Sequence, residues 1–116
     1  MSGAEASSIM NQYFAALVNG DVITLKSLLA GDLLNRRRSL LDNPEYPGFL
    51  STTYMNATLK VLNIDASRPY TVVIDALITF KQGDSIKNEY VLRKSPPQTG
   101  GSRYRIVSET PTAEAF

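Results

Sequence analysis

The sequence predicts an α+β fold in which N-terminal helices pack on an antiparallel β-sheet. Up to about residue 50, apolar residues recur every three or four positions, which is the period of an amphipathic helix. Over the next ~60 residues they alternate with polar residues, which is the period of a β-strand. Helices followed by a run of strands indicate an α+β protein, because each set of elements must cover the apolar face of the other.

The length of 116 residues favours one domain, residues 1–116, with a core large enough to need no metal or disulfide. Within it we expect a helical part at 6–50, a sheet at 51–109 and a frayed tail at 110–116. The hydrophobic fraction of 43% and the charged fraction of 20% are ordinary for a globular protein.

Charge and missing residue types narrow the functions open to the chain. Its 12 basic and 11 acidic residues give a net charge of +1, so we expect no nucleic-acid partner. It contains no cysteine and no histidine, so we expect no metal and no cofactor. No apolar run approaches ~18 residues, so we expect no membrane insertion. Residues 1–5 do not resemble a signal peptide; a cytoplasmic location is the default expectation, with export if a leader has been removed.

The first helix is expected to begin at a cap formed by Ser7 or Ser8 and to run to about Asn19. Gly20 then ends it, because glycine adopts the left-handed conformation at little cost. Its inward face is a stripe of apolar side chains at helical spacing. That stripe comprises Ile9, Met10, Tyr13, Phe14, Ala16 and Leu17.

Two further short helices follow. Asp21 is expected to cap the second, Gly31 to end it, and Asp32 to cap the third. Their candidate core residues are Leu25, Leu28, Leu29, Leu33, Leu34, Leu40 and Leu41. Residues 43–44 end the helical part, and the sequence Tyr-Pro-Gly at 46–48 predicts a rigid turn beside a buried Phe49 and Leu50.

The rest of the chain predicts four strands. They are expected at 53–64, 70–81, 86–94 and 103–109. Residues 82–84 predict a three-residue hairpin loop between the second and third strands, and 95–101 a loop before the last. This hairpin pairs Phe80 with Ile86, Ala76 with Tyr90, and Ile74 with Leu92.

The second strand separates its side chains into two faces. One face is wholly apolar and is expected to lie under the helices: Tyr70, Val72, Ile74, Ala76, Ile78 and Phe80. The other mixes apolar and charged residues, which is typical of a sheet that meets a second copy across a two-fold axis. The expected dimer face comprises Val73, Asp75, Leu77, Val91, Arg93 and Arg105. The alternative is a solvated face with scattered valines.

Residues 13–21, the leucine pair at 28–29, and the stretches 92–94 and 104–106 resemble the nuclear transport factor 2-like superfamily. The similarity covers about residues 6–109, and this chain has a tyrosine at 104 where many members have tryptophan. The resemblance implies a cone-shaped roll in which a curved antiparallel sheet wraps a long helix. It also implies that the open end of the cone is a ligand pocket and that the sheets dimerise.

Enzymes of this superfamily, such as ketosteroid isomerases, scytalone dehydratases and polyketide cyclases, place Asp, His or Tyr in the pocket. Without histidine, a carboxylate must be the base and a tyrosine the hydrogen-bond donor. The strand carboxylates are Asp65, Asp75, Glu89 and Glu109. Asp75 lies deepest in an apolar strand, yet alternation places it on the face away from the helices. We therefore assign no catalytic residue.

The resemblance places a pocket at the open end of the cone. Its expected lining residues are Tyr13, Leu17, Tyr54, Asn88, Tyr90 and Tyr104. Aromatic walls with a few hydroxyls suit a small apolar ligand, and the alternative is that these rings are simply core. The arginine run 36–38 either holds a phosphate or carboxylate, or is a solvated helix end whose side chains spread around the axis.

These features favour a small, non-catalytic binding or interaction module that forms a homodimer, and whose cone either holds an apolar small molecule or is filled by its own side chains. The first alternative is an isomerase, dehydratase or cyclase that uses a pocket carboxylate and a tyrosine. The second is a structural dimerisation domain of a secretion or envelope complex. A carboxylate inside the cone with a tyrosine in hydrogen-bond reach distinguishes the enzyme.

Overall fold

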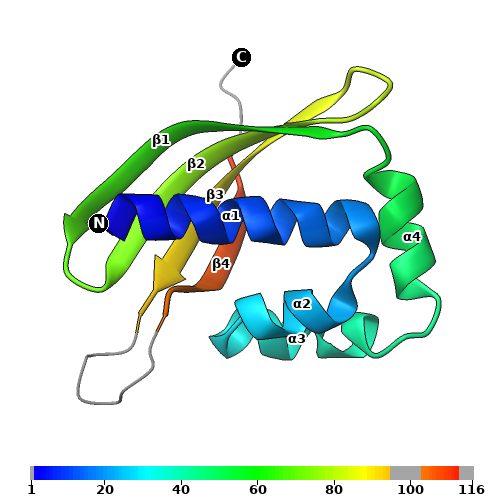
Figure 1. Cartoon of the computed structure of the whole chain (residues 1–116), viewed down its shortest axis with the longest axis horizontal. Helices are drawn as coiled ribbons and strands as arrows, with labels where there is room; N and C mark the ends of the chain where they lie inside the picture. Colours follow the sequence, from blue (N-terminus) through cyan, green and yellow to red (C-terminus); the bar gives the residue numbers. More distant parts are fainter. Residues whose placement is uncertain (1, 95–102, 113–116) are drawn as a thin grey trace.

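A computed structural model describes residues 2–94 and 103–112 of the chain (Figure 1). In these residues four helices precede four strands. They are α1 (Ser2–Asn19), α2 (Val22–Leu28), α3 (Gly31–Leu41), α4 (Tyr46–Thr53), β1 (Thr58–Arg68), β2 (Thr71–Thr79), β3 (Ser85–Arg93) and β4 (Arg105–Pro111). The expected α+β fold is confirmed. The loop expected at 95–101 lies outside the described residues, whereas the strands before and after it are described.

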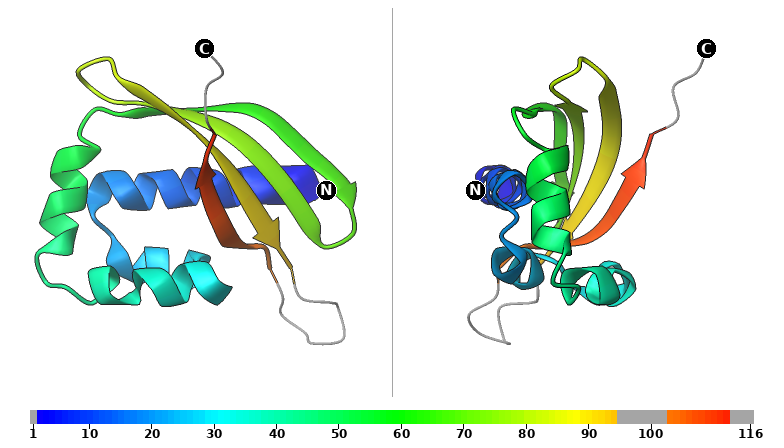
Figure 2. Two further views of the ribbon diagram at one scale, coloured as in Figure 1. Left: turned by 180° about the vertical axis from the view of Figure 1, so that it is seen from behind. Right: turned by 90° about the vertical axis from the view of Figure 1, so that its right-hand side faces the viewer.

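The strands form one antiparallel sheet in the order β1-β2-β3-β4. The sheet curves around α1, and the helices all lie on one side of it (Figure 2). α1 packs on β1 and β2, while α2 and α3 pack on β4. No helix in the described part of the chain is long and apolar enough to cross a bilayer.

The core lies between α1 and the concave face of the sheet. In β2, buried residues alternate strictly with half-buried ones, as the period of two predicts. The buried set is Val72, Ile74, Ala76 and Ile78. Tyr70 departs from the expected apolar face: it is 43% exposed, and its φ of 60° places it in the β1–β2 turn.

The helix starts differ from those expected. α1 begins at Ser2 and not at a Ser7 or Ser8 cap, because its first turns pack on the sheet and bury Ala6 completely. The side chain of Asp21 caps α2 by accepting a hydrogen bond from the Thr24 amide at 3.1 Å, as predicted.

α3 begins at Gly31, one residue before the expected Asp32 cap. A parallel bridge pairs Leu29 with Ile106 of β4, and the Ala30 amide donates to the Ile106 carbonyl at 3.0 Å. This pairing holds Ala30 extended and sets the start of the helix, so a backbone contact with the sheet replaces a side-chain cap.

The turn expected at 46–48 is instead the first turn of α4. Proline is favoured there, because the first amides of a helix have no intrahelical acceptor. The helix buries Leu50 but leaves Phe49 61% exposed, so Phe49 is not the predicted buried residue. Leu40, expected in the core, is 46% exposed. β1 consequently runs over 58–68 and not 53–64.

The β2–β3 hairpin is shifted by two residues from the expected register. Its pairs include Ile74 with Tyr90, Ala76 with Asn88, and Ile78 with Ile86. The Phe80 amide donates to the Asp84 carbonyl at 2.8 Å, which leaves residues 81–83 as the loop. Such a loop needs its left-handed residue last, and Gly83, with φ of 102°, takes that place. A shift of two residues keeps every side chain on its expected face.

β4 runs over 105–111 and not 103–109. The Thr112 amide also donates to the Lys87 carbonyl at 2.8 Å, so the chain pairs with β3 beyond the point where a frayed tail was expected. Residues 113–116 lie outside the described part.

Gly20 allows the end of α1 to approach the first turn of α4 closely. It has φ of +64°, and a Cβ placed on it would lie 2.4 Å from the carbonyl oxygen of Pro47. Gly31 has a similar φ of +62° but nothing within 4 Å of such a Cβ. A side chain at either glycine would therefore strain the backbone, but only a side chain at Gly20 would also clash with a neighbouring residue.

We expect Gly20→Ala to lower the free energy of unfolding by about 3 kcal/mol, since it adds a clash with backbone to the strain of a left-handed alanine. Gly31→Ala, the matched control, should cost only about 1 kcal/mol. Urea unfolding measures both. Equal losses for the two variants would contradict the close packing of Gly20 on Pro47.

Candidate functional site

On the inner side of the sheet, Arg37 of α3 forms an ion pair with Glu109 of β4. The Arg37 guanidinium donates to Glu109 Oε1, and the Tyr13 hydroxyl donates to Glu109 Oε2 at 2.8 Å. Arg37 Nη1 also approaches the Tyr13 hydroxyl oxygen at 3.4 Å. The two charged side chains are 27% and 14% exposed. We call Tyr13, Arg37 and Glu109 the ionic triad; it joins α1, α3 and β4.

A β-bulge turns Glu109 inward. Leu92 pairs with Ile106 and Val91 pairs with Ser108, which leaves Val107 as an extra residue in β4. Without the bulge, a strand that buries Ile106 would direct Glu109 outward. Regular alternation therefore missed this residue as a member of the interior, although it was counted among the strand carboxylates.

Arg37 is the central residue of the arginine run at 36–38. Consecutive residues on a helix are about 100° apart, so only one of the three side chains faces the sheet. Arg36 and Arg38 are exposed, whereas Arg37 is half-buried. The interpretation as a solvated helix end fits Arg36 and Arg38. The interpretation as a carboxylate-binding group fits Arg37, but the carboxylate is that of Glu109 in the same chain.

Burial and the charge of Glu109 both raise the pKa of the tyrosine hydroxyls around the ionic triad. Burial raises the pKa of Tyr13 well above its ordinary value, and the Glu109 carboxylate raises it further. The same two causes raise the pKa of Tyr90, Tyr54 and Tyr46. Although burial alone lowers the pKa of Arg37, the Glu109 charge reverses that effect and the pKa of Arg37 is raised. All these phenols therefore keep their protons at neutral pH, and the Tyr13 hydroxyl donates its hydrogen to Glu109.

Of the expected pocket residues, the structure brings Tyr13, Asn88 and Tyr90 together. The Tyr13 and Tyr90 rings meet edge to face with centroids 5.8 Å apart, and Asn88 Nδ2 donates to the Tyr90 hydroxyl at 3.1 Å. Tyr13 and Tyr90 are in the hydrophobic core together with Leu17 and Tyr104, so these rings pack among apolar side chains.

Two expected pocket residues have other surroundings. Tyr54 lies at the end of α4 and not on the first strand, and its ring contacts Phe14 and Phe80 at centroid distances of 6.4 and 5.5 Å. Tyr104 immediately precedes β4 and is buried, and the Lys94 ammonium lies 5.6 Å from its ring centroid.

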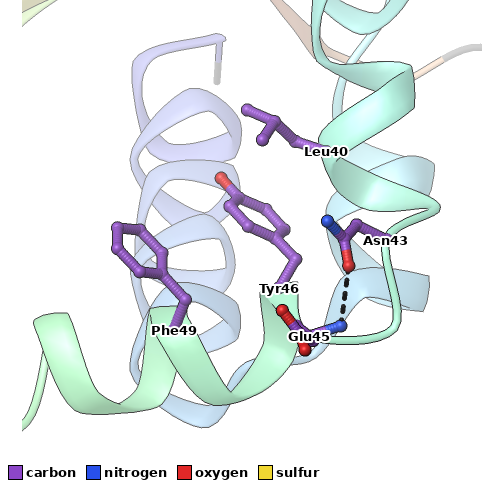
Figure 3. Close-up of a pocket in the computed structure, with 5 residues that line it drawn as sticks. All are labelled: Leu40, Asn43, Glu45, Tyr46 and Phe49. Carbon is purple, nitrogen blue, oxygen red and sulfur yellow. Dashed lines mark hydrogen bonds between the residues drawn. The ribbon is translucent and has the colours of Figure 1, made fainter.

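A groove of about 420 Å³ lies between α3 and α4 (Figure 3). Its lining residues are Leu40, Asn43, Glu45, Tyr46 and Phe49. The Tyr46 and Phe49 rings stack with centroids 6.0 Å apart and an interplanar angle of 14°. Asn43 Oδ1 accepts from the Glu45 amide at 2.9 Å. We call this the α3–α4 groove. The sequence prediction missed it, because it expected Leu40 and Phe49 to be core.

The expected dimer-face residues lie on the sheet face away from the helices. Val73, Asp75, Leu77 and Val91 are half-buried there, and Arg93 and Arg105 are exposed. A hollow of about 420 Å³ opens on this face. Among residues 2–94 and 103–112, no group of acidic side chains is placed to hold a metal ion.

No protein-family model, curated protein or solved structure matches the chain. The resemblance to the nuclear transport factor 2-like superfamily therefore stays a prediction, and function must be argued from the site itself.

The ionic triad predicts a specific effect of Tyr13→Phe on stability. The raised pKa of folded Tyr13 gives stability that is complete below pH ~10, where unfolded tyrosine titrates, and that is lost as pH rises above it. We expect the variant to lower the free energy of unfolding by about 2 kcal/mol at pH 8, through loss of a hydrogen bond to a carboxylate. Above pH ~10 the free energy of unfolding should fall less steeply with pH for the variant than for the parent. The difference between the two slopes should be about 1.4 kcal/mol per pH unit.

Urea unfolding between pH 8 and pH 11 measures both effects. Tyr70→Phe is the control, since its ring is 43% exposed, and it should change stability at pH 8 by less than ~0.5 kcal/mol. An unchanged high-pH slope for Tyr13→Phe would show that its hydroxyl is not buried against Glu109.

Proposed function

We propose that the chain is a non-catalytic binding module that takes a small, largely apolar ligand into the α3–α4 groove. The observation that carries this proposal is the exposed aromatic wall of the groove. Phe49 is 61% exposed and Leu40 is 46% exposed, and both border the same hollow of about 420 Å³. Ligand pockets usually enclose roughly 300–1,000 Å³ and have mainly apolar walls.

The groove is supported by rigid neighbours. The ring of Tyr46 lies between Leu40 and Phe49 (Figure 3) and stacks on Phe49. Leu50, next to Phe49 in α4, is 2% exposed and attaches the helix to the core. A preformed wall loses little conformational freedom on binding, which favours affinity for a small ligand.

Polar groups at one side of the groove indicate the ligand class. Asn43 Oδ1 accepts from the Glu45 amide, so the group that Asn43 can offer a ligand is its amide nitrogen, which is a donor. Burial and the Glu109 charge raise the pKa of Tyr46, so its phenol also donates. The Glu45 carboxylate disfavours anions. The ligand we propose is a neutral ring or short aliphatic body that bears a carbonyl, hydroxyl or ether oxygen.

Binding of N-phenyl-1-naphthylamine, a neutral apolar fluorophore, tests this function. We expect its fluorescence to rise on binding to the parent, and Phe49→Ala to weaken the affinity about tenfold through loss of an aromatic wall. Ile23→Ala is the matched control, because Ile23 is 80% exposed on α2, away from the groove. Anilinonaphthalene sulfonate, with the same rings and a negative charge, should bind more weakly than the neutral probe.

Two results would overturn the assignment to this groove. One is probe binding that survives Phe49→Ala unchanged. The other is probe binding that is lost in Tyr54→Leu, with Phe49→Ala silent, which would instead support the pocket expected inside the cone.

The second candidate function is an isomerase, dehydratase or cyclase. The observation that favours it is Glu109, an interior carboxylate whose Oε2 lies 2.8 Å from the Tyr13 hydroxyl oxygen. Arg37 opposes it, because that side chain occupies the other carboxylate oxygen and a base must be free to accept a proton. The binding module is therefore the better supported of the two.

Proton exchange distinguishes the enzyme from the binding module. An enzyme of this class should exchange the α-hydrogens of a β,γ-unsaturated ketone with D2O, as followed by NMR, and Glu109→Gln should abolish the exchange. We expect no exchange above the buffer rate with the parent. Exchange that depends on Glu109 would favour the enzyme.

A further inference from the structure

The hollow on the outer face of the sheet has basic residues at one end and acidic residues at the other. Its volume is about 420 Å³, and nine residues of β1, β2 and β3 or of the turn between β1 and β2 line it. The helices all lie on the other side of the sheet, so no helix of the described chain covers this hollow (Figure 2).

The strand register orders the nine lining residues as three rows that run across the three strands. The basic end consists of Arg68, Thr71 and Arg93. The middle row consists of Asp65, Val73 and Val91. The acidic end consists of Asn63, Asp75 and Glu89. On β2 and β3 the two ends are four residues apart, which is about 13 Å along an extended strand.

The charges at both ends are left without compensation. Asp75 lies directly opposite Glu89, and Arg93 lies directly opposite Arg105 of β4. Like charges in such cross-strand positions are destabilising. In the part of the chain that the structure describes, neither these four residues nor Arg68 belong to an ion pair. A ligand that supplies the opposite charge at each end would remove this cost.

The floor between the two ends is largely apolar. Val73 and Val91 are half-buried there. Asp65, the third member of the middle row, already has its Oδ1 occupied, because this atom accepts from the amide and the hydroxyl of Ser67 at 3.0 and 2.6 Å. The middle row therefore offers apolar contact, and the free charges are those at the ends.

We propose that this hollow binds a short linear zwitterion, of the class of an extended tripeptide with free termini and an apolar middle residue. Its carboxylate lies over Thr71, between the guanidinium groups of Arg68 and Arg93, since arginine binds carboxylates with two hydrogen bonds. Its ammonium lies over Asp75 and Glu89 and donates to their carboxylates. This site is separate from the α3–α4 groove and does not depend on the function proposed for that groove.

The size of the hollow agrees with such a ligand. An extended chain spans at most about 3.3–3.6 Å per residue, so three residues reach about 10 Å. The long side chains of Arg68 and Arg93 cover the rest of the distance between the two ends. The middle side chain of the tripeptide then lies on Val73 and Val91.

The presence of both signs favours a zwitterion over a simple anion or cation. An anion held by the arginines would leave the repulsion between Asp75 and Glu89 in place, and a cation held by these carboxylates would leave the arginines uncompensated. A ligand charged at both ends is attracted at both, and it is oriented by them.

The tripeptide Ala-Val-Ala with free termini is the probe, and its binding is followed by NMR chemical-shift titration at physiological salt. We expect saturable shifts that include the amides of Val73 and Val91. The N-acetylated and the C-amidated forms of the same tripeptide should each bind at least about tenfold more weakly, because each loses one hydrogen-bonded charge.

Variants assign each end of the probe to its residues. Arg93→Gln should weaken binding of the free tripeptide about tenfold but scarcely change binding of the amidated form, which has no carboxylate to lose. Glu89→Gln should do the same with respect to the acetylated form. Glu89→Gln also relieves the repulsion with Asp75, so it should not destabilise the fold, and circular dichroism checks this for every variant.

Two further variants are matched controls. Lys60 lies opposite Leu77 on the same face, beyond the acidic end, and it does not line the hollow. Lys60→Gln should therefore change tripeptide binding less than twofold, although it removes the same charge as Arg93→Gln. Phe49→Ala alters the α3–α4 groove and should have no effect on the tripeptide, which keeps this test independent of the one for that groove.

Several results would overturn the proposal. These are a parent that does not bind the free tripeptide, capped tripeptides that bind as tightly as the free one, and a Lys60→Gln variant that loses as much affinity as Arg93→Gln. The last result would show that binding follows net charge and not the hollow. Sedimentation that shows a dimer, with NMR shifts of Val73 and Val91 that depend on protein concentration and not on the tripeptide, would show that a second copy covers the hollow instead.

Discussion

The ion pair between Arg37 and Glu109 is the interaction on which the arrangement of the helices on the sheet depends. It joins α3 to β4, and the Tyr13 hydroxyl extends the contact to α1. A buried ion pair contributes little net stability compared with a pair of apolar side chains. Removing one partner of a fully buried pair, however, leaves the other charge unpaired and costs about 3–5 kcal/mol of stability. It therefore fixes which way α3 faces more than it stabilises the fold. The bulge at Val107 makes this geometry possible by turning Glu109 inward.

The position of α4 follows from that of its neighbours. With α3 held by Arg37 and by the Leu29–Ile106 bridge, the chain returns through Pro47, whose carbonyl packs against Gly20. α4 buries Leu50 against the core, while Phe49 on the same helix is 61% exposed. The exposed groove is thus a consequence of how the helices close, and the proposed ligand would cover what the chain itself does not.

The two faces of the sheet differ in how their polar and charged side chains are paired. Among the described residues, the polar side chains buried on the inner face include the ionic triad and the hydrogen-bonded pair of Asn88 and Tyr90, and no buried side-chain nitrogen or oxygen there lacks a partner. The outer face places like charges opposite one another and leaves them unpaired within the described residues.

Local residue patterns were enough to predict several features of the fold. The period of two placed Ile74 and Asp75 on opposite faces, and Asp21 capped α2 as expected. The residues of the candidate site depend instead on contacts between elements far apart in the chain. The bulge that turns Glu109 inward has no local signal, since it depends on how β4 pairs with β3. Pro47 fits a turn and a first helical turn equally well, so packing against Gly20 chose between them.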